Sequence, residues 1–202
     1  MSEVLRGRPR DTAVDTAIVN ATEAVLLSHG YAAINIDRVA KLAGTTRAAI
    51  YRRAKTRGEL VVGLLVSRFG VDPAPDSGDL HQDLRQLQEL QRDFFIDPVI
   101  QAALAGVLSD LRADDHLGAV FYERFMAPRR HSVAAMLARA SGRGEIRLTT
   151  HPNVVSDLLT GPLLLRAVMP PTGPIDEALL DATVQAALSA CSIPIAPKII
   201  GQ

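Results

Sequence analysis

Apolar residues recur three and four positions apart along most of the chain. The run between residues 11 and 29 ends at Gly30 and has five such positions: Val14, Ala17, Ile18, Ala21 and Val25. This spacing predicts an amphipathic helix, because 3.6 residues per turn bring these positions onto one face. No alternating stretch longer than residues 145–148 occurs. The pattern therefore predicts an all-α fold of about nine helices.

A tight turn joins the next two helical stretches, which are short. Asn35 and Thr46 can cap the two helices, and Gly44 can adopt the left-handed backbone of a tight turn. The small Ala40 and the large apolar Ile50 let the two helices meet at a steep angle. This arrangement predicts a helix-turn-helix. Thr56 and Glu59 then form a capping box, in which each side chain can bond the other residue's backbone N–H, and this predicts the start of a fourth helix.

The segment VDPAPDSG, residues 71–78, interrupts the helical pattern. Apolar periodicity after it predicts five further helices, the third bent near Pro128 and the fourth kinked at Pro162. They cover residues 80–94, 98–111, 120–137, 150–167 and 176–191.

The chain is neutral overall, but its charge is unevenly distributed. Residues 1–70 contain 11 Lys and Arg against 6 Asp and Glu, and the rest contains 11 against 16. A basic end on an acidic body is typical of DNA-binding proteins. We expect a three-helix DNA-binding domain with the start of the fourth helix at residues 1–70, a helical bundle at 79–192 and a tail at 193–202.

The second helix of the helix-turn-helix and the residues after it are strongly basic. Five cations occur there without one acid: Arg47, Arg52, Arg53, Lys55 and Arg57. Tyr51 adds a phenol that can donate to a phosphate oxygen. Thr45, Thr46 and Arg47 lie at the helix N-terminus, the end that such helices bring to the major groove. Charge alone also fits a solvated face, but together with the turn it predicts DNA binding.

Arg6 and Arg8, with Arg10, surround Gly7 and Pro9 at the start of the chain. This composition fits an arm that enters the minor groove. An ordinary terminus without that role is the alternative, and the sequence leaves both open.

Composition sets the broad class of the protein. The chain is 48% apolar and 22% charged, which is typical of a globular protein. It contains neither a stretch of about 18 apolar residues nor a charged-then-apolar leader. Its one cysteine, Cys191, cannot form an internal disulfide, which fits a reducing compartment. We expect a cytoplasmic protein without a membrane segment.

Catalytic and metal-binding patterns are missing from the sequence. The five histidines include no pair four positions apart. No phosphate-binding glycine loop and no Gly-x-Ser-x-Gly motif occur. We therefore expect no enzyme, no metal site and no cofactor.

The stretch GYAAINIDRVAKLAGTTRAAIYRRAKTRGELV resembles the TetR family of transcriptional regulators, and the helices after it are similar to that family's architecture. The resemblance implies that Asn35 and Thr46 cap helices and touch the DNA backbone. It places Arg47 and Tyr51 in the recognition helix and Arg57 against a phosphate. The complete set of expected DNA contacts is Arg6, Arg8, Asn35, Thr45, Thr46, Arg47, Ala48, Tyr51, Arg52, Lys55 and Arg57.

Three positions depart from the family pattern. Ala54 replaces an aromatic residue, Lys55 replaces a frequent proline, and Ala49 replaces a frequent threonine. We expect Ala54 to alter the packing under the fourth helix and Ala49 to remove one polar contact.

The resemblance further implies a repressor that binds a pseudo-palindromic operator as a homodimer and leaves it when a small molecule binds the C-terminal domain. The dimer helices would be residues 150–167 and 176–191, through Leu158, Leu159, Leu163, Ala182, Ala186, Ala187 and Ala190. Packing of these helices within one subunit is the alternative.

A cavity for that small molecule is expected among the helices between residues 80 and 167. Its predicted lining is apolar: Phe94, Leu104, Leu108, Phe121, Phe125 and Leu159. The ligand should therefore be mostly apolar. A fully packed core with no ligand is the alternative.

Two other functions fit the sequence. The protein is an activator or a regulator that needs no ligand, or it is a helical small-molecule-binding protein with a vestigial helix-turn-helix. Steep loss of DNA affinity with rising salt separates the regulators from the binding protein.

Overall fold

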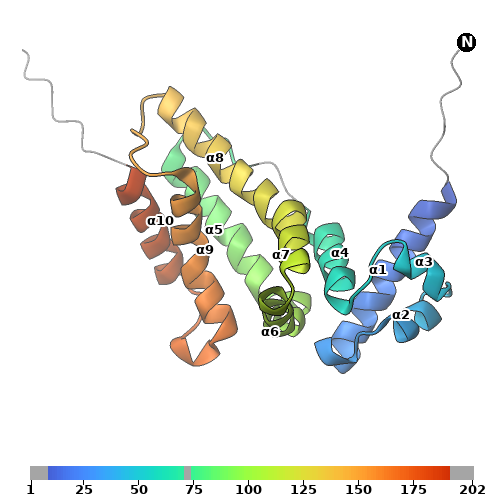
Figure 1. The fold of residues 1–202 in the computed structure, drawn as a ribbon. Coiled ribbons are helices and arrows are strands. Elements are labelled where there is room, and N and C mark those ends of the chain that lie inside the picture. The colour runs from blue at the N-terminus through green and yellow to red at the C-terminus, as the bar shows by residue number, and fades with distance from the viewer. Residues whose placement is uncertain (1–8, 71–73, 192–202) are drawn as a thin grey trace, which may run out of the picture. The chain divides into compact units, whose positions relative to one another are not determined.

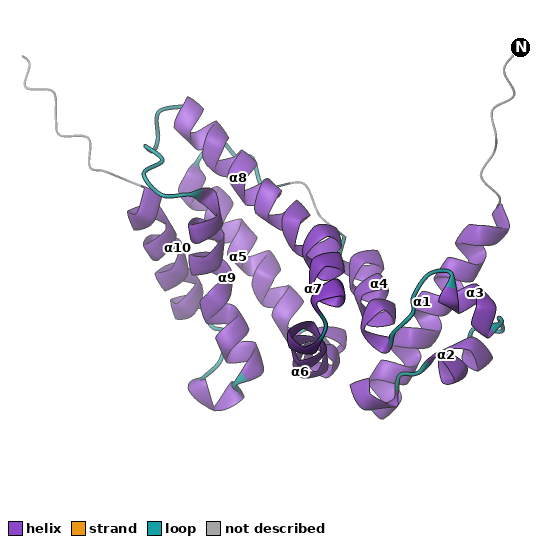
Figure 2. Ribbon diagram, viewed as in Figure 1, coloured by secondary structure: helices purple, strands orange, loops and turns teal. Residues whose placement is uncertain are grey.

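The structure is a computed structural model, which describes residues 9–70 and 74–191. Within these ranges the chain forms helices joined by loops and turns, without a strand (Figure 1 and Figure 2). The predicted all-α fold is therefore confirmed.

Packing divides the described chain into two compact units. The first unit contains residues 9–70 and 97–127, and the second contains residues 74–96 and 128–191. The predicted boundary at residues 71–78 assigns 97–127 to the later domain, whereas the structure packs these residues with the N-terminal helices. The apolar side chains of residues 97–127 cover the helix at residues 57–69, which the N-terminal helices do not bury by themselves.

The N-terminal part of the first unit supplies the predicted helices. Its elements are α1 (Pro9–His29), the 3-10 turn η1 (Tyr31–Ala33), α2 (Ile36–Leu42), α3 (Arg47–Tyr51) and α4 (Arg57–Phe69). α1 ends at His29, directly before Gly30, whose φ of 77° few other residues adopt. Ile18, Ala21 and Val25 are buried, as the spacing predicts.

The remainder of the first unit covers α4. It consists of α6 (Pro98–Ala113), α7 (Asp115–Phe121) and the π turn η2 (Tyr122–Met126). α4 packs against α1, α6 and α7, and five of its large apolar side chains are buried: Leu60, Val61, Val62, Leu64 and Leu65. A Cβ on Gly58 would lie 2.4 Å from Leu117 Cδ2 in α7, so a larger residue at 58 would force the Leu117 side chain to shift.

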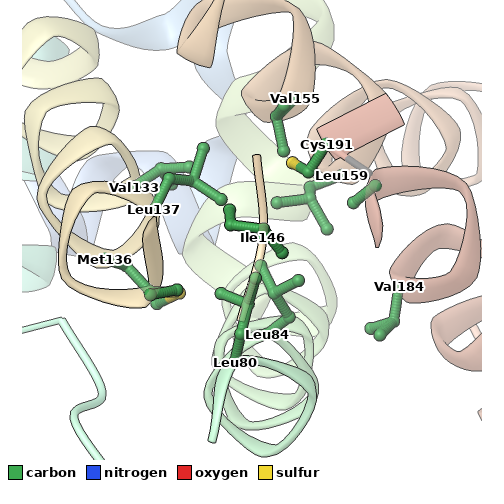
Figure 3. Close-up of a cluster of buried hydrophobic side chains, with 12 residues drawn as sticks. Leu80, Leu84, Val133, Met136, Leu137, Ile146, Val155, Leu159, Val184 and Cys191 are labelled. Atoms are coloured by element: carbon green, nitrogen blue, oxygen red, sulfur yellow. The ribbon is translucent and has the colours of Figure 1, made fainter. Parts of the chain in front are cut away.

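The second unit has one apolar core. Its elements are α5 (Leu80–Ile96), α8 (Ala127–Gly142), α9 (Pro152–Val168), the 3-10 turn η3 (Pro170–Thr172) and α10 (Glu177–Cys191). The core cluster, part of which is labelled in Figure 3, is Leu80, Leu84, Val133, Met136, Leu137, Ala140, Ile146, Val155, Leu159, Val184, Ala187 and Cys191.

A buried polar side chain links three helices of this unit. Gln88 of α5 is fully buried, and its Nε2 donates to the Leu159 carbonyl of α9 at 3.0 Å and to the Thr183 hydroxyl of α10. The same faces bury Leu163 and Ala187 completely. The prediction that Leu159, Leu163 and Ala187 lie on a surface between subunits is therefore wrong, because these residues face α5 and the core.

The long helix predicted around Pro128 is interrupted in one place. Residues 115–142 are helical throughout, but Tyr122–Met126 form a π turn. Pro128 has no N–H, and its ring crowds the carbonyl four residues earlier. The wider π turn absorbs this mismatch directly before the proline.

The helix predicted from Thr150 begins two residues later, at Pro152. His151 is its cap, and His151 Nδ1 accepts the Asn153 N–H at 3.2 Å.

In the described part of the chain, no single helix is both long and apolar enough to cross a membrane. Only α5 and α6 taken together pass that test of length and composition, and each buries its apolar face within its own unit.

A candidate DNA-binding surface

The turn between α2 and α3 has the predicted backbone. Asn35 Oδ1 accepts the Arg38 N–H at 2.8 Å, and Thr46 Oγ1 accepts the Ala49 N–H at 3.1 Å. Gly44 has a φ of 61°, which a residue with a side chain adopts only with strain. Capping at both helix starts and the glycine turn fix α3 relative to α2, so the two predicted caps are confirmed.

α3 has one buried face and one exposed face. Ala49 and Ile50 are buried, whereas five of the predicted contact residues are exposed: Thr46, Arg47, Ala48, Tyr51 and Arg52. Lys55 follows and is exposed, and Thr45 is half-buried in the turn. The phenol of Tyr51 lies near Arg47, where it can donate to a phosphate oxygen. The structure thus brings the predicted contact residues of α3 onto one surface, which we call the α3 surface.

Two neighbouring groups hold Arg47. Its Nε lies 2.9 Å from Asp37 Oδ1 in α2. A hydrogen bond to Tyr51, one turn later, and secondly the charge of Asp37 raise the pKa of Arg47 above its ordinary value. The side chains of Arg47 and Asp37 are 61% and 66% exposed, so the pair remains accessible to a further partner.

Arg53 does not belong to this surface. Its guanidinium pairs with Asp15 of α1 and donates to the Ala49 carbonyl at 2.9 Å. Arg53 therefore ties α3 to α1. The sequence pattern counted it among the outward cations because the pairing partner lies 38 residues away.

Arg57 forms hydrogen bonds within the first unit. Its Nε and Nη2 donate to the two carboxylate oxygens of Asp110 in α6, each at 2.9 Å. Tyr31 donates its hydroxyl to the same carboxylate at 2.8 Å, and the guanidinium lies 5.1 Å from the centre of the Tyr31 ring. In this conformation the arginine joins the start of α4 to α6, so its phosphate contact stays a prediction that requires these bonds to open.

The three partners shift one another's protonation. Hydrogen bonds from Arg57, and further a hydrogen bond from Tyr31, lower the pKa of Asp110 below its usual range. Burial, followed by the contact with Asp110, raises the pKa of Tyr31. The ring of Tyr31 fits against Gly106, where an added Cβ would lie 2.2 Å from Tyr31 Cδ1. The Asp110 carboxylate is therefore ionised at neutral pH, and glycine at 106 admits the ring beside it.

We expect Asp110→Asn to lower the free energy of unfolding by about 0.5–1 kcal/mol at pH 7, since the pair is partly exposed and screened. Because the folded-state pKa of Asp110 is lowered, the carboxylate stabilises the fold above its ordinary pKa of about 4 and loses that effect as the pH falls further. Urea unfolding of both proteins at several pH values measures the difference. The difference in unfolding free energy between wild type and Asp110→Asn should disappear in acid. Glu123→Gln, at an exposed acid of the same unit, should leave the unfolding free energy unchanged at every pH. A difference that persists at pH 2 would contradict this assignment.

The predicted ligand-lining residues fall in both units. Phe121 and Phe125 stack in the first unit with ring centres 5.1 Å apart, and Leu104 and Leu108 lie half-buried on α6. In the second unit Leu159 is part of the core cluster. Phe94 there packs edge-on against its neighbour Phe95, and the guanidinium of Arg129 lies 5.9 Å from the Phe94 ring centre. A cavity shared by the six residues stays a prediction.

Two predicted contact residues, Arg6 and Arg8, lie outside the described residues. Asn35 is described and exposed, with its oxygen used for the cap. Among the described residues no group of three His, Cys, Asp or Glu side chains is placed to hold a metal ion.

Comparison with known proteins matches both parts of the chain. Residues 18–64 match the domain described as "Bacterial regulatory proteins, tetR family", and residues 74–187 match "Tetracyclin repressor-like, C-terminal domain". An uncharacterized HTH-type transcriptional regulator of Mycobacterium bovis, Mb1581, is 30% identical over 87% of this chain and 88% of its own length.

Solved structures share the fold. The TetR family transcription regulator SCO0332 matches with a TM-score of 0.72 and 24% identity, over 89% of this chain and 99% of its own. FadR from Bacillus subtilis, solved in complex with stearoyl-CoA, matches with a TM-score of 0.62 and 13% identity, over 87% and 98%. With a helix-turn-helix that exposes a basic recognition helix, and with family matches over both of its parts, this chain belongs to the TetR family of DNA-binding transcription regulators, which are not enzymes.

Proposed function

We propose that the protein is a homodimeric repressor that binds a pseudo-palindromic operator and leaves it when a mostly apolar small molecule binds. The α3 surface is the observation that carries this proposal. It presents Arg47, Tyr51 and Arg52 from a turn whose caps and glycine fix the helix. Two copies of this surface, one from each subunit, would enter successive major grooves of the operator.

An exposed apolar stripe on α9 supports the dimer. Val154, Leu165 and Val168 are 45%, 49% and 43% exposed, and they lie at helical spacing on the face opposite the core. Ala182 and Ala186 of α10 are also exposed and small. Exposed apolar side chains on one face of a helix are typical of a surface that another protein covers. A second copy of this chain is the partner that a palindromic operator requires.

The DNA interaction is tested by sequencing the genomic fragments that the protein retains and by measuring affinity for one of them at several salt concentrations. We expect affinity to fall about 10³–10⁵-fold between 50 and 200 mM salt if each dimer makes 6–10 phosphate contacts. Arg52→Ala and Lys55→Ala should each flatten that salt slope. Arg147→Ala, at an exposed arginine of the second unit, is the matched control and should leave the slope unchanged. Retention of no specific fragment would reject the function.

The small-molecule step is proposed from the apolar character of the predicted lining and from the family relative FadR, which was solved with stearoyl-CoA. A ligand can release DNA only if it binds more tightly to the conformation that does not fit the operator. The second unit contains the partly exposed Phe94 beside Arg129, a combination suited to an apolar chain with a polar or anionic end.

We expect long-chain acyl-CoA or free fatty acid to raise the melting temperature and to lower operator affinity in parallel. The Arg47→Ala variant should show the same thermal shift although it binds operator weakly, which separates ligand binding from DNA binding. A compound that stabilises the protein but leaves the DNA complex intact would remove the release mechanism.

A further inference from the structure

We propose that Arg47 reads a guanine in each operator half-site through the terminal nitrogens of its guanidinium, and that Asp37 positions Arg47 for this contact. The inference rests on the proposed function, because it concerns which bases the α3 surface selects. The contact between Asp37 and Arg47 carries it.

Asp37 is an acid on a basic surface. The exposed side chains of α2, α3 and the residue after α3 include the cations Arg38, Lys41, Arg47 and Arg52. An exposed carboxylate facing DNA repels phosphate and lowers affinity. An acid in the first turn of α2 also stabilises that helix through its interaction with the helix dipole. This effect does not require the carboxylate to contact Arg47. Asp37 Oδ1 instead lies 2.9 Å from Arg47 Nε, which indicates a role through the arginine.

The pairing leaves the base-reading edge of Arg47 available. A guanidinium carries five N–H groups in one plane, one on Nε and four on the terminal nitrogens. Asp37 lies beside Nε, and the phenol of Tyr51, one turn later on α3, is close enough to shift the pKa of Arg47. A bond to Tyr51 would still leave N–H groups on both terminal nitrogens. The pairing with Asp37 restricts the rotation of a long side chain that is 61% exposed.

Guanine is the base that matches this edge. It presents two acceptors, N7 and O6, to the major groove, and a guanidinium can donate to both at once. Adenine offers one acceptor and one donor there, so it can accept only one of the two guanidinium N–H bonds. Arg47 is the first residue of α3, within the part of a recognition helix that contacts base edges.

Positioning by Asp37 should raise selectivity more than affinity. An unrestrained arginine can turn to a phosphate, a contact that every sequence offers. With Nε paired to Asp37, the side chain is held in one arrangement before it meets DNA, so less freedom is lost on binding the correct base. Removal of the acid should therefore weaken discrimination while the attraction to phosphate remains.

The test uses the operator found by fragment sequencing. Each base pair of the half-site is replaced in turn, symmetrically in both halves, and affinity is measured for the full-length protein and its variants. We expect one G·C pair whose replacement weakens wild-type binding about tenfold to a hundredfold. Arg47→Ala should bind all bases there equally. Asp37→Ala and Asp37→Asn should reduce the discrimination to a few-fold. Their melting temperatures should stay within a few degrees of the wild type, because only the helix-dipole effect of one exposed acid is lost. The double variant should match Arg47→Ala alone.

Arg52→Ala is the matched control, because Arg52 is an exposed arginine of the same helix end. It should weaken binding to all sequences by one factor. Three results would overturn the inference: no guanine whose contribution depends on Arg47, a loss in Asp37→Ala that is uniform over all bases, or effects of Asp37 and Arg47 that add independently, as a direct contact from Asp37 to cytosine would give. A wild-type protein that binds no specific fragment rejects the proposed function as well, whereas salt-dependent operator binding without the guanine effect rejects this inference alone.

Discussion

Replacement of Leu165 with glutamate should convert the protein to a monomer at micromolar concentration. Leu165 is 49% exposed on the apolar stripe of α9, and a stable interface of at least ~1,000 Å² would bury it. A buried, unpaired carboxylate in that interface would oppose association strongly. In the proposed dimer each subunit would read one half-site, so a monomer would lose the gain from linking two contacts and operator affinity should fall about 10²–10⁴-fold.

Sedimentation velocity measures the first effect, and fluorescence anisotropy with labelled operator measures the second. Leu90→Glu is the matched control, because Leu90 is 43% exposed but lies on α5 of the same unit. The control should remain a dimer with wild-type affinity. If Leu165→Glu stays dimeric, the interface lies elsewhere. A monomer that still binds operator at full affinity would reject the dimer as the DNA-binding form.

Truncation of Leu137 to alanine should lower the free energy of unfolding by about 2–5 kcal/mol. Leu137 of α8 is completely buried in the core cluster, between residues contributed by several helices. Removal of three carbon atoms there loses hydrophobic transfer energy and leaves a cavity that the surrounding helices fill only in part. For a domain of ordinary stability this is a large share of the total.

Urea unfolding monitored by far-UV circular dichroism gives the value. Leu148→Ala, at a 38%-exposed leucine of the same unit, should change stability by less than about 0.5 kcal/mol. An equal loss in both variants would mean that the cluster is not the main source of stability in this unit.

The fold was largely predictable because its signals are local. Caps such as Thr46, Asp97 and Asp176 accept bonds from residues two or three positions ahead, and apolar periodicity needs only one helix. The packing partner of each helix was not predictable in this way. Residues 97–127 pack with the N-terminal helices, and no pattern within α6 or α7 states which helix they cover.

The exposed residues of α3 were predictable for the same reason, since a five-residue helix that buries Ala49 and Ile50 must expose most of the residues on either side of them. Individual cations were less predictable. Arg53 and Arg57 read as outward charges, but their carboxylate partners lie 38 and 53 residues away. Sequence separation of this size leaves no periodic signal. The predicted ligand lining also cannot be judged by periodicity, because one apolar face serves equally well for a packed core and for a cavity wall.

The single cysteine has a practical consequence. Cys191 is completely buried in the core cluster, and burial raises the pKa of its thiol, so the reactive thiolate is scarce and inaccessible in the native protein. A cysteine introduced at an exposed position such as Ala32 can therefore be spin-labelled without first removing the native one. In a dimer, each subunit would then carry one label beside its helix-turn-helix. The label-to-label distance, measured by pulsed electron resonance with and without operator or acyl-CoA, would report directly whether an effector changes the separation of the two reading heads.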